Sequence, residues 1–210
     1  MIVYPVIYTA VSTGLRQAEL LGLSWRDIDL DYLSISVNKA LYKRRGICQF
    51  NEPKTAHSRR RVSMTPKLAL FLRDYRAECE LLYLEQDKML NLDSLVFTNA
   101  EGKPFDPGVL SHTFNKIVRQ AGLEHVRFHD LRHTFASLML LKGAQPKVIS
   151  EALGHSSVAF TMDVYSHIIE GMQQDAMTLL DEVLPAGKNG ESRKNNADLT
   201  QLSGVMSSKP

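Results

Sequence analysis

The chain has 210 residues, a hydrophobic content of 44% and a net charge of +2, which is the composition of a globular protein with one domain, or one domain and a tail. It has no apolar run near the roughly 20 residues that a membrane-spanning helix needs, and its N-terminus lacks the pattern of a secretory signal. The two cysteines, Cys48 and Cys79, have neither metal-binding spacing nor the density of a disulfide scaffold, so we expect a reduced, cytoplasmic protein with no membrane segment.

The first third of the chain predicts a helical segment followed by a small antiparallel sheet. Residues 4–23 have helical periodicity with a break near Gly14. Apolar and polar side chains then alternate over residues 33–37, which is typical of a half-buried strand. Further strands are expected around residues 47–50 and 61–64, and the three strands together would form one sheet.

The rest of the chain predicts helices and a polar tail. Thr65-Pro66 and Asp106-Pro107 each place a capping side chain before a proline, which is how many helices begin. Apolar side chains at helical spacing extend these two helices and predict further ones. The expected helices are 66–82, 107–122, 128–141, 146–153, 157–169 and 175–183, and residues 185–210 are expected to be a disordered tail. The predicted fold class is therefore mainly α with a small antiparallel β-sheet (α+β).

Basic side chains are concentrated between Lys39 and Lys67. This stretch has nine basic residues and the single acidic residue Glu52, a net charge of +8 on a chain that is nearly neutral. Such a local excess is typical of a surface that binds a polyanion. A run of solvated charges with no partner is the alternative, and the charges alone do not decide between the two.

Three short motifs contain side chains that could carry out chemistry. Arg16 follows a glycine at a helix start, where backbone N–H groups and a guanidinium can face one anion. His129 and Arg132 are three residues apart and lie on one helix face. His155 follows a helix stop, and Tyr165 comes ten residues later.

Each of these side chains also has a structural explanation. Arg16 could pair with Glu19 at the surface, and His129 could cap the helix that follows it. His155 could simply occupy a loop, and Tyr165 could be a core aromatic. A function for any one of them therefore depends on the whole set.

His129 and His133 also have the i,i+4 spacing of a zinc-binding pair. Zinc hydrolases with this spacing carry Glu after the first histidine as the general base. Here that position is Asp130, and Arg132 would place a permanent positive charge beside the metal. The sequence also lacks the Gly-x-Ser-x-Gly, P-loop and Gly-x-Gly-x-x-Gly motifs. We therefore expect neither a metal site nor another cofactor.

As a set, these side chains suit the transfer of a phosphodiester. Negative charge builds up on the non-bridging oxygens of a phosphodiester under attack, and arginine neutralises it with a planar fork that keeps its proton. Arg16 and Arg132 could clamp those oxygens without a metal ion. Tyrosine is a suitable nucleophile because an aryl phosphodiester can be attacked again by a hydroxyl. Histidine can accept the phenolic proton, and lysine can protonate the departing oxygen.

The motifs TGLRQAELLGLSWRDID, PKTAHSRRRV, HDLRHTFAS, LGH and YSH occur in this order, and over residues 1–184 the chain resembles the catalytic domain of the tyrosine recombinase, or phage integrase, family. The resemblance implies helices flanking a small antiparallel sheet. It also implies a phosphate clamp of Arg16 and Arg132, proton transfer by His129, phosphate binding by His155, attack by Tyr165, protonation of the leaving 5′ oxygen by Lys54, and structural support from Glu19. The expected contacts to the DNA backbone are Lys43, Arg44, Arg45, His57, Arg59, Arg60 and Arg61.

The same resemblance implies double-stranded DNA as the partner and a homotetramer on two paired DNA sites, with a monomer expected in the absence of DNA. Residues 170–184 could dock on a neighbouring copy or fold back on their own domain. Because residue 1 already falls at the first helix of the resemblance, we expect the core-binding domain that precedes the catalytic domain in this family to be absent. A DNA-binding or regulatory fragment without turnover, and a strand transferase of the type IB topoisomerase kind, are the alternatives.

Overall fold

The computed structural model describes residues 3–51, 59–99, 101–123, 125–155, 157–166 and 168. These residues belong to the first of two units into which the chain divides, Met1–Ile169. The expected helix at 175–183, the expected tail at 185–210 and the two site residues Lys54 and His57 lie outside the described residues.

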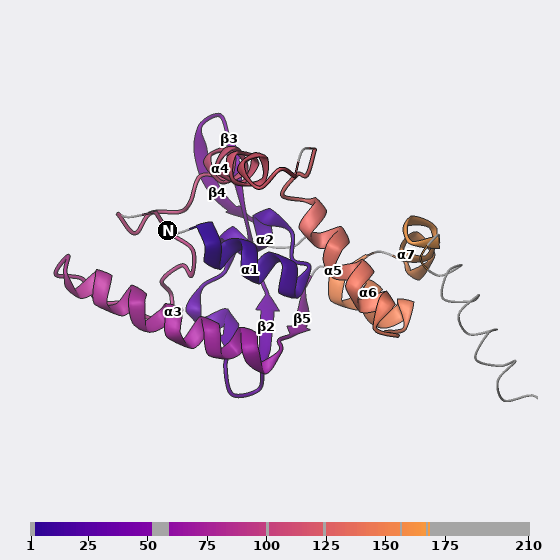
Figure 1. Cartoon of the computed structure of the whole chain (residues 1–210). Helices are drawn as coiled ribbons and strands as arrows, with labels where there is room; N and C mark the ends of the chain where they lie inside the picture. The colour runs from indigo at the N-terminus through magenta and orange to yellow at the C-terminus, as the bar shows by residue number, and fades with distance from the viewer. Residues whose placement is uncertain are drawn as a thin grey trace, which may run out of the picture. The chain divides into compact units, whose positions relative to one another are not determined.

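The described part of the chain is mainly helical, with two small antiparallel sheets (Figure 1). This confirms the predicted fold class and the break near Gly14, which separates the first two helices. The elements are α1 (Val3–Thr13), α2 (Gln17–Gly22), the short 3-10 helix η1 (Trp25–Asp27), β1 (Ile28–Asp29), β2 (Ser34–Val37), β3 (Ala40–Arg44), β4 (Ile47–Asn51), β5 (Arg60–Ser63), α3 (Pro66–Leu84), α4 (Pro107–Gln120), α5 (Asp130–Leu141), α6 (Pro146–Leu153) and α7 (Val158–Val164).

Three of the described helices begin at side-chain caps, and the sequence predicts those of α3 and α4. The Thr65 hydroxyl accepts a hydrogen bond from the Leu68 N–H at the start of α3. The Asp106 carboxylate accepts from two backbone N–H groups at the start of α4, and the Ser157 hydroxyl accepts from the Phe160 N–H in α7. Each cap satisfies N–H groups that have no partner inside the helix.

The strand pairing differs from the prediction of a single sheet. β2 is the centre of a three-stranded sheet with the order β1-β2-β5, in which Ile35 lies opposite Val62. The strand expected around 47–50 exists as β4, but it pairs with β3 in a separate hairpin, so its predicted place in the sheet is wrong. The turn between β3 and β4 is Arg45-Gly46, and both residues have positive φ, 49° and 83°. A two-residue turn of this kind favours pairing of the two strands that it joins.

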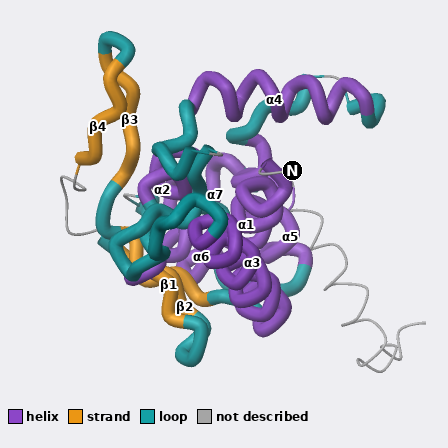
Figure 2. Tube along the Cα trace, turned by 90° about the vertical axis from the view of Figure 1, so that its left-hand side faces the viewer, coloured by secondary structure: helices purple, strands orange, loops and turns teal. Residues whose placement is uncertain are grey.

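The β3–β4 hairpin extends away from the helices (Figure 2). Its side chains from Tyr42 to Ile47 are exposed, while Leu41 at its base is buried. The hairpin is tethered to the helical part at this base, where β3 contacts α2.

The core surrounds α1 and α2. α1 contacts α2, α3, α4 and α5, and Val6, Leu20 and Leu21 are completely buried. One side of the core is aromatic, because the Tyr8 ring packs edge-on against Phe71 with 4.8 Å between ring centroids. Burial of these apolar side chains is the main force that holds the helices around the sheet.

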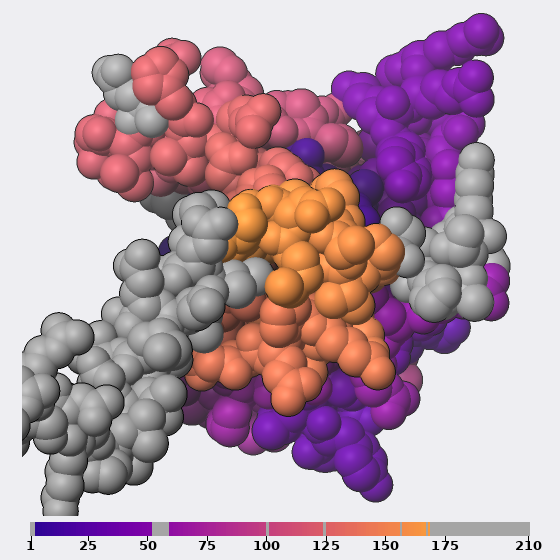
Figure 3. Space-filling model, turned by 90° about the vertical axis from the view of Figure 1, so that its right-hand side faces the viewer, coloured from indigo at the N-terminus to yellow at the C-terminus, as the bar shows by residue number. Residues whose placement is uncertain are grey.

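α5, α6 and α7 follow one another in space as they do in sequence, and α6 also contacts β5. In the space-filling view α7 lies at the surface with α6 next to it (Figure 3). Gly14 allows the end of α1 to approach these helices, since a Cβ atom there would lie 2.5 Å from Phe135 Cδ1 and 2.7 Å from Leu153 Cδ2. Its φ of +66° is also one that glycine adopts without strain.

Among the described helices, none combines the length and the apolar character that crossing a lipid bilayer requires.

Candidate active site

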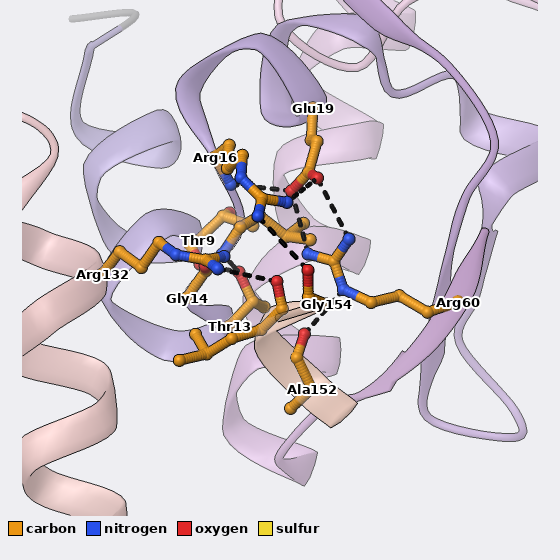
Figure 4. A network of polar contacts seen from close by, with 11 residues as sticks. Thr9, Thr13, Gly14, Arg16, Glu19, Arg60, Arg132, Ala152 and Gly154 are labelled. Atoms are coloured by element: carbon orange, nitrogen blue, oxygen red, sulfur yellow. Dashed lines mark hydrogen bonds and ion pairs between the residues drawn. The ribbon is translucent and has the colours of Figure 1, made fainter. Parts of the chain in front are cut away.

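A buried carboxylate between two arginines forms the centre of the site (Figure 4). Glu19 lies in the first turn of α2, and both of its oxygens accept hydrogen bonds from Arg60 on β5, at 3.0 and 2.9 Å. The Arg16 guanidinium donates to the same carboxylate at 2.8 Å, and so does the Arg16 backbone N–H. The side chains of Arg60 and Glu19 are only 7% and 8% exposed, so this ion pair is shielded from water.

The arginines determine the charge state of Glu19. Burial by itself raises the pKa of the carboxyl group, but the hydrogen bonds and charges of Arg60 and Arg16 outweigh burial and hold the pKa below its ordinary value. Glu19 is therefore ionised at neutral pH. It fixes the direction in which the two guanidinium groups point.

The last carbonyls of α6 bind three arginines. The carbonyl oxygens of Ala152, Leu153 and Gly154 accept hydrogen bonds from Arg60 Nε at 2.7 Å, from Arg132 Nη2 at 2.7 Å and from Arg16 Nη2 at 3.3 Å, respectively. Such carbonyls have no partner within their own helix, and the helix end carries partial negative charge. The end of α6 therefore binds cations from three places in the chain: the residue before α2, β5 and α5.

Arg132 is buried, and its guanidinium also donates to the Gly14 carbonyl at 2.7 Å (Figure 4). Burial and the neighbouring Arg16 lower the pKa of Arg132 to about 10, so it stays charged at neutral pH. Among the described residues, its guanidinium hydrogen-bonds only to the Gly14 and Leu153 carbonyls. Within the described part of the chain, three of its five N–H groups therefore have no hydrogen-bond partner and could donate to an anion.

His155 follows the left-handed Gly154 that ends α6. Its Nδ1 lies 2.8 Å from the hydroxyl oxygen of Thr161, and the Phe160 ring packs edge-on against it at 4.9 Å between centroids. Burial, followed by the charges of Arg132, Arg16 and Arg60, lowers the pKa of His155 to about 4. The imidazole is therefore neutral near pH 7.

Tyr165 ends α7 and is 3% exposed. Its hydroxyl lies 2.9 Å from Nδ1 of His133 on α5. Burial raises the pKa of the phenol, and the Arg132 charge opposes that increase. The phenol is therefore protonated at neutral pH, and attack by its oxygen needs a group that accepts the proton.

His129 lies at the start of α5 without capping the helix through its side chain. Its ring packs edge-on against His133 with 5.1 Å between centroids. Partial desolvation, followed by the charges of His133 and Arg132, lowers the pKa of His129. In the part of the chain that the structure describes, no three His, Cys, Asp or Glu side chains are grouped so that they could hold a metal ion.

The structure brings together most of the residues predicted for the site. The charges that act on His155 and Arg132 come from the other members of the set. The predicted site residues that converge are Arg16, Glu19, Arg60, His129, Arg132, His155 and Tyr165. Lys54 and His57 lie outside the described residues, so their predicted roles stay predictions.

The predicted DNA contacts occupy two different environments. Lys43, Arg44 and Arg45 are exposed on the β3–β4 hairpin, where Lys43 pairs with Asp106 at the start of α4. Arg59 and Arg61 are exposed as well. Arg60 differs from these, because its side chain is buried and bonded to Glu19 and Ala152.

Two residues of the site escaped the sequence prediction. The spacing of His133 from His129 drew attention only as a zinc pair, although the same spacing puts His133 on the face of α5 that meets Tyr165. Thr161 precedes Tyr165 by four residues, and no motif marked it. Its role depends on the contact with His155, which the sequence does not contain.

Comparisons with known proteins show which proteins the chain resembles. The model of the family described as "Phage integrase family" matches residues 4–171. The XerC-like tyrosine recombinase of Caldanaerobacter subterraneus is 32% identical over 186 residues, which cover 83% of this chain and 48% of the relative. The ICEBs1 integrase of Bacillus subtilis is 33% identical over 184 residues, 87% of this chain and 50% of the relative. The chain thus spans about half the length of these curated relatives.

The fold has a counterpart among solved structures. The integrase of transposon Tn1549, in complex with transposon right-end DNA, matches with a TM-score of 0.66 and 24% identity. The match covers 85% of this chain and 58% of that chain. At this identity the likeness supports the fold.

Proposed function

Because the chain belongs to the phage integrase family of tyrosine recombinases, we propose that it cuts and rejoins DNA as the catalytic part of a site-specific recombinase of a mobile element. The observation that carries the proposal is the convergence of Arg16, Arg132 and His155 beside the buried phenol of Tyr165. Positive charge and a neutral histidine there suit a phosphodiester, and the phenol suits a covalent intermediate.

The proposed reaction is a transesterification. The Tyr165 oxygen attacks the phosphorus of the scissile phosphodiester, and the bond from phosphorus to the 5′ oxygen breaks. The products are a 3′-phosphotyrosyl linkage and a free 5′ hydroxyl. Arg16 and Arg132 stabilise the charge on the non-bridging oxygens in the transition state, and Lys54 is the proposed donor of the proton that the 5′ oxygen takes up. Attack by a 5′ hydroxyl of a partner strand reverses these steps and releases the phenol.

The phenolic proton is proposed to pass to His133. The 2.9 Å contact between the Tyr165 hydroxyl and His133 Nδ1 supports this assignment, since a general base must lie within hydrogen-bond reach of the proton it accepts. The family resemblance implied this role for His129, whose ring packs against that of His133. We propose that His129 orients His133 and faces the DNA.

The substrate is proposed to be double-stranded DNA, held by its phosphates. The exposed Lys43, Arg44 and Arg45 on the projecting hairpin support contact with a polyanion at a distance from the reacting phosphate. The proposal includes a cytoplasmic location and assembly of four copies on two DNA sites. Exchange of strands between two duplexes needs a nucleophile for each of the four strands.

A suicide substrate tests the proposal. A nicked duplex that carries the end sequence of the element should lose its short 5′-hydroxyl fragment after cleavage, which traps an adduct that resists denaturing electrophoresis. Tyr165→Phe should bind the same duplex and form no adduct. An adduct that persists in this variant would overturn the assignment of the nucleophile.

A salt titration of DNA binding and a plasmid relaxation assay, together with the adduct assay, separate the alternative functions. Binding that weakens steeply with salt, without any adduct in the unsubstituted protein, would favour a DNA-binding or regulatory fragment. Relaxation of supercoiled plasmid without preference for the element ends would favour a topoisomerase-like strand transferase.

A further inference from the structure

We propose that Thr161 is a positioning residue that fixes the tautomer of His155, so that His155 presents an Nε2–H donor to the scissile phosphate. Thr161 lies on α7, is completely buried, and its hydroxyl oxygen is 2.8 Å from His155 Nδ1. The inference rests on the proposed function, because the anion that the donor serves is the phosphodiester.

The direction of the hydrogen bond follows from the needs of the buried hydroxyl. Other threonines in helices of this chain donate to the carbonyl four residues earlier, as Thr9 does to Pro5 and Thr134 to Asp130. Among the described residues, His155 Nδ1 is the one group to which the Thr161 hydroxyl is hydrogen-bonded. A buried hydroxyl whose proton has no acceptor destabilises the folded protein. Thr161 therefore donates and Nδ1 accepts.

The surrounding charges make the choice of tautomer matter. Burial and three arginines keep the imidazole neutral near pH 7, so it carries a single ring proton. With Nδ1 as the acceptor, that proton is on Nε2. Nε2–H can then donate to a phosphate oxygen, whereas the opposite tautomer would turn a lone pair towards the anion.

Thr161 also connects His155 to the nucleophile. Its carbonyl oxygen accepts the backbone N–H of Tyr165 at 3.2 Å, while its hydroxyl binds the histidine ring. The edge-on Phe160 ring limits rotation of the same imidazole. Thr161 therefore positions both the His155 imidazole, which is proposed to bind the phosphate, and the backbone of Tyr165, which carries the attacking phenol.

The tautomer can be measured without DNA. Ring-nitrogen NMR of ¹⁵N-histidine-labelled protein, with His155 assigned by comparison with His155→Gln, should show an unprotonated Nδ1 and a protonated Nε2. Thr161→Ser keeps the hydroxyl and should preserve this pattern. Thr161→Val has nearly the same shape without the donor and should move the signals towards a mixture of tautomers. A protonated Nδ1 in the unsubstituted protein, or an unchanged pattern in Thr161→Val, would overturn the inference.

Cleavage kinetics provide the functional readout. In single-turnover cleavage of the suicide duplex, Thr161→Val should be slower by about tenfold, the effect of losing one hydrogen bond of ordinary strength in the transition state. Thr161→Ser should stay within about twofold of the unsubstituted rate, and the duplex affinity of both should be unchanged. If the unsubstituted protein forms no adduct, the proposed function fails and the NMR result still decides the tautomer. An adduct that forms at the same rate in Thr161→Val refutes the inference alone.

Discussion

Replacing Arg60 by methionine removes one partner of a buried ion pair and keeps most of the side-chain volume. Arg60 and Glu19 are each less than a tenth exposed, and removing one member of such a pair costs about 3–5 kcal/mol because the other charge stays buried. Glu19 retains Arg16, so we expect the lower end, about 3 kcal/mol. For a domain of this size that is a fall in Tm of about 6–12 °C.

The pH dependence of the lost stability shows whether the buried charge of Glu19 causes it. In the unsubstituted protein the pKa of Glu19 lies below its ordinary value of 4.5, so its ionised form contributes stability above that pH, and the contribution disappears as pH falls through the lowered pKa. Arg60→Met removes the hydrogen bond and the charge of Arg60, the two largest causes that lower the pKa, and keeps the burial that raises it, so the pKa of Glu19 should rise. The difference in stability between the two proteins should then be largest near pH 7 and shrink as the pH falls towards 4.

Denaturant unfolding followed by circular dichroism at pH 7 and at pH 4.5 measures this difference. Arg61→Met is the matched control, because Arg61 is the next residue on β5 and is exposed; it should change stability by less than about 0.5 kcal/mol. An equal loss in both variants, or a loss in Arg60→Met that is the same at both pH values, would refute the reasoning.

Further substitutions test other parts of the molecule. Gly14→Ala should lower the free energy of unfolding by about 2–5 kcal/mol, because alanine is strained at a left-handed φ and its Cβ would clash with Phe135 and Leu153. Thermal unfolding measures the effect, and a fall in Tm of less than about 2 °C would contradict the close approach. His133→Gln should slow adduct formation about 100-fold or more, and part of the rate should return as rising pH ionises Tyr165. If His129→Gln shows this loss and His133→Gln does not, His129 is the base. Arg44→Met should weaken DNA binding on every sequence alike and reduce the salt dependence by about one charge, which titrations at several salt concentrations measure.

The helices could be predicted from the sequence because their ends are marked locally. Thr65 and Asp106 stand before prolines at helix starts, and Gly154 adopts the left-handed conformation at a helix end. The pairing of the strands could not be predicted from alternation alone, because alternation reports burial and carries no information about the neighbouring strand. The local clue was the turn at Arg45-Gly46, whose positive φ values favour a hairpin.

The site, too, could be predicted from the sequence only in part. The resemblance of the motifs located Arg16, Arg132 and Tyr165, whereas the partners of these residues depend on tertiary packing. Arg60 is the middle one of three consecutive arginines, and charge alone does not show which of them is buried. Alternation along β5 distinguishes them, because Arg60 is two residues from the buried Val62 and therefore shares its inward face.

The end of α6 has a consequence for the charge balance of the site. Among the described residues, Arg16, Arg60 and Arg132 meet there with Glu19 as their carboxylate partner, and these three cations and one anion together have a net charge of +2. A phosphodiester brings one negative charge in its ground state, and its pentacovalent transition state carries two. In the proposed reaction this guanidinium cluster would be electrostatically complementary to the transition state and overcharged for the ground-state phosphodiester. Such a match would lower the activation barrier without tightening substrate binding to the same degree.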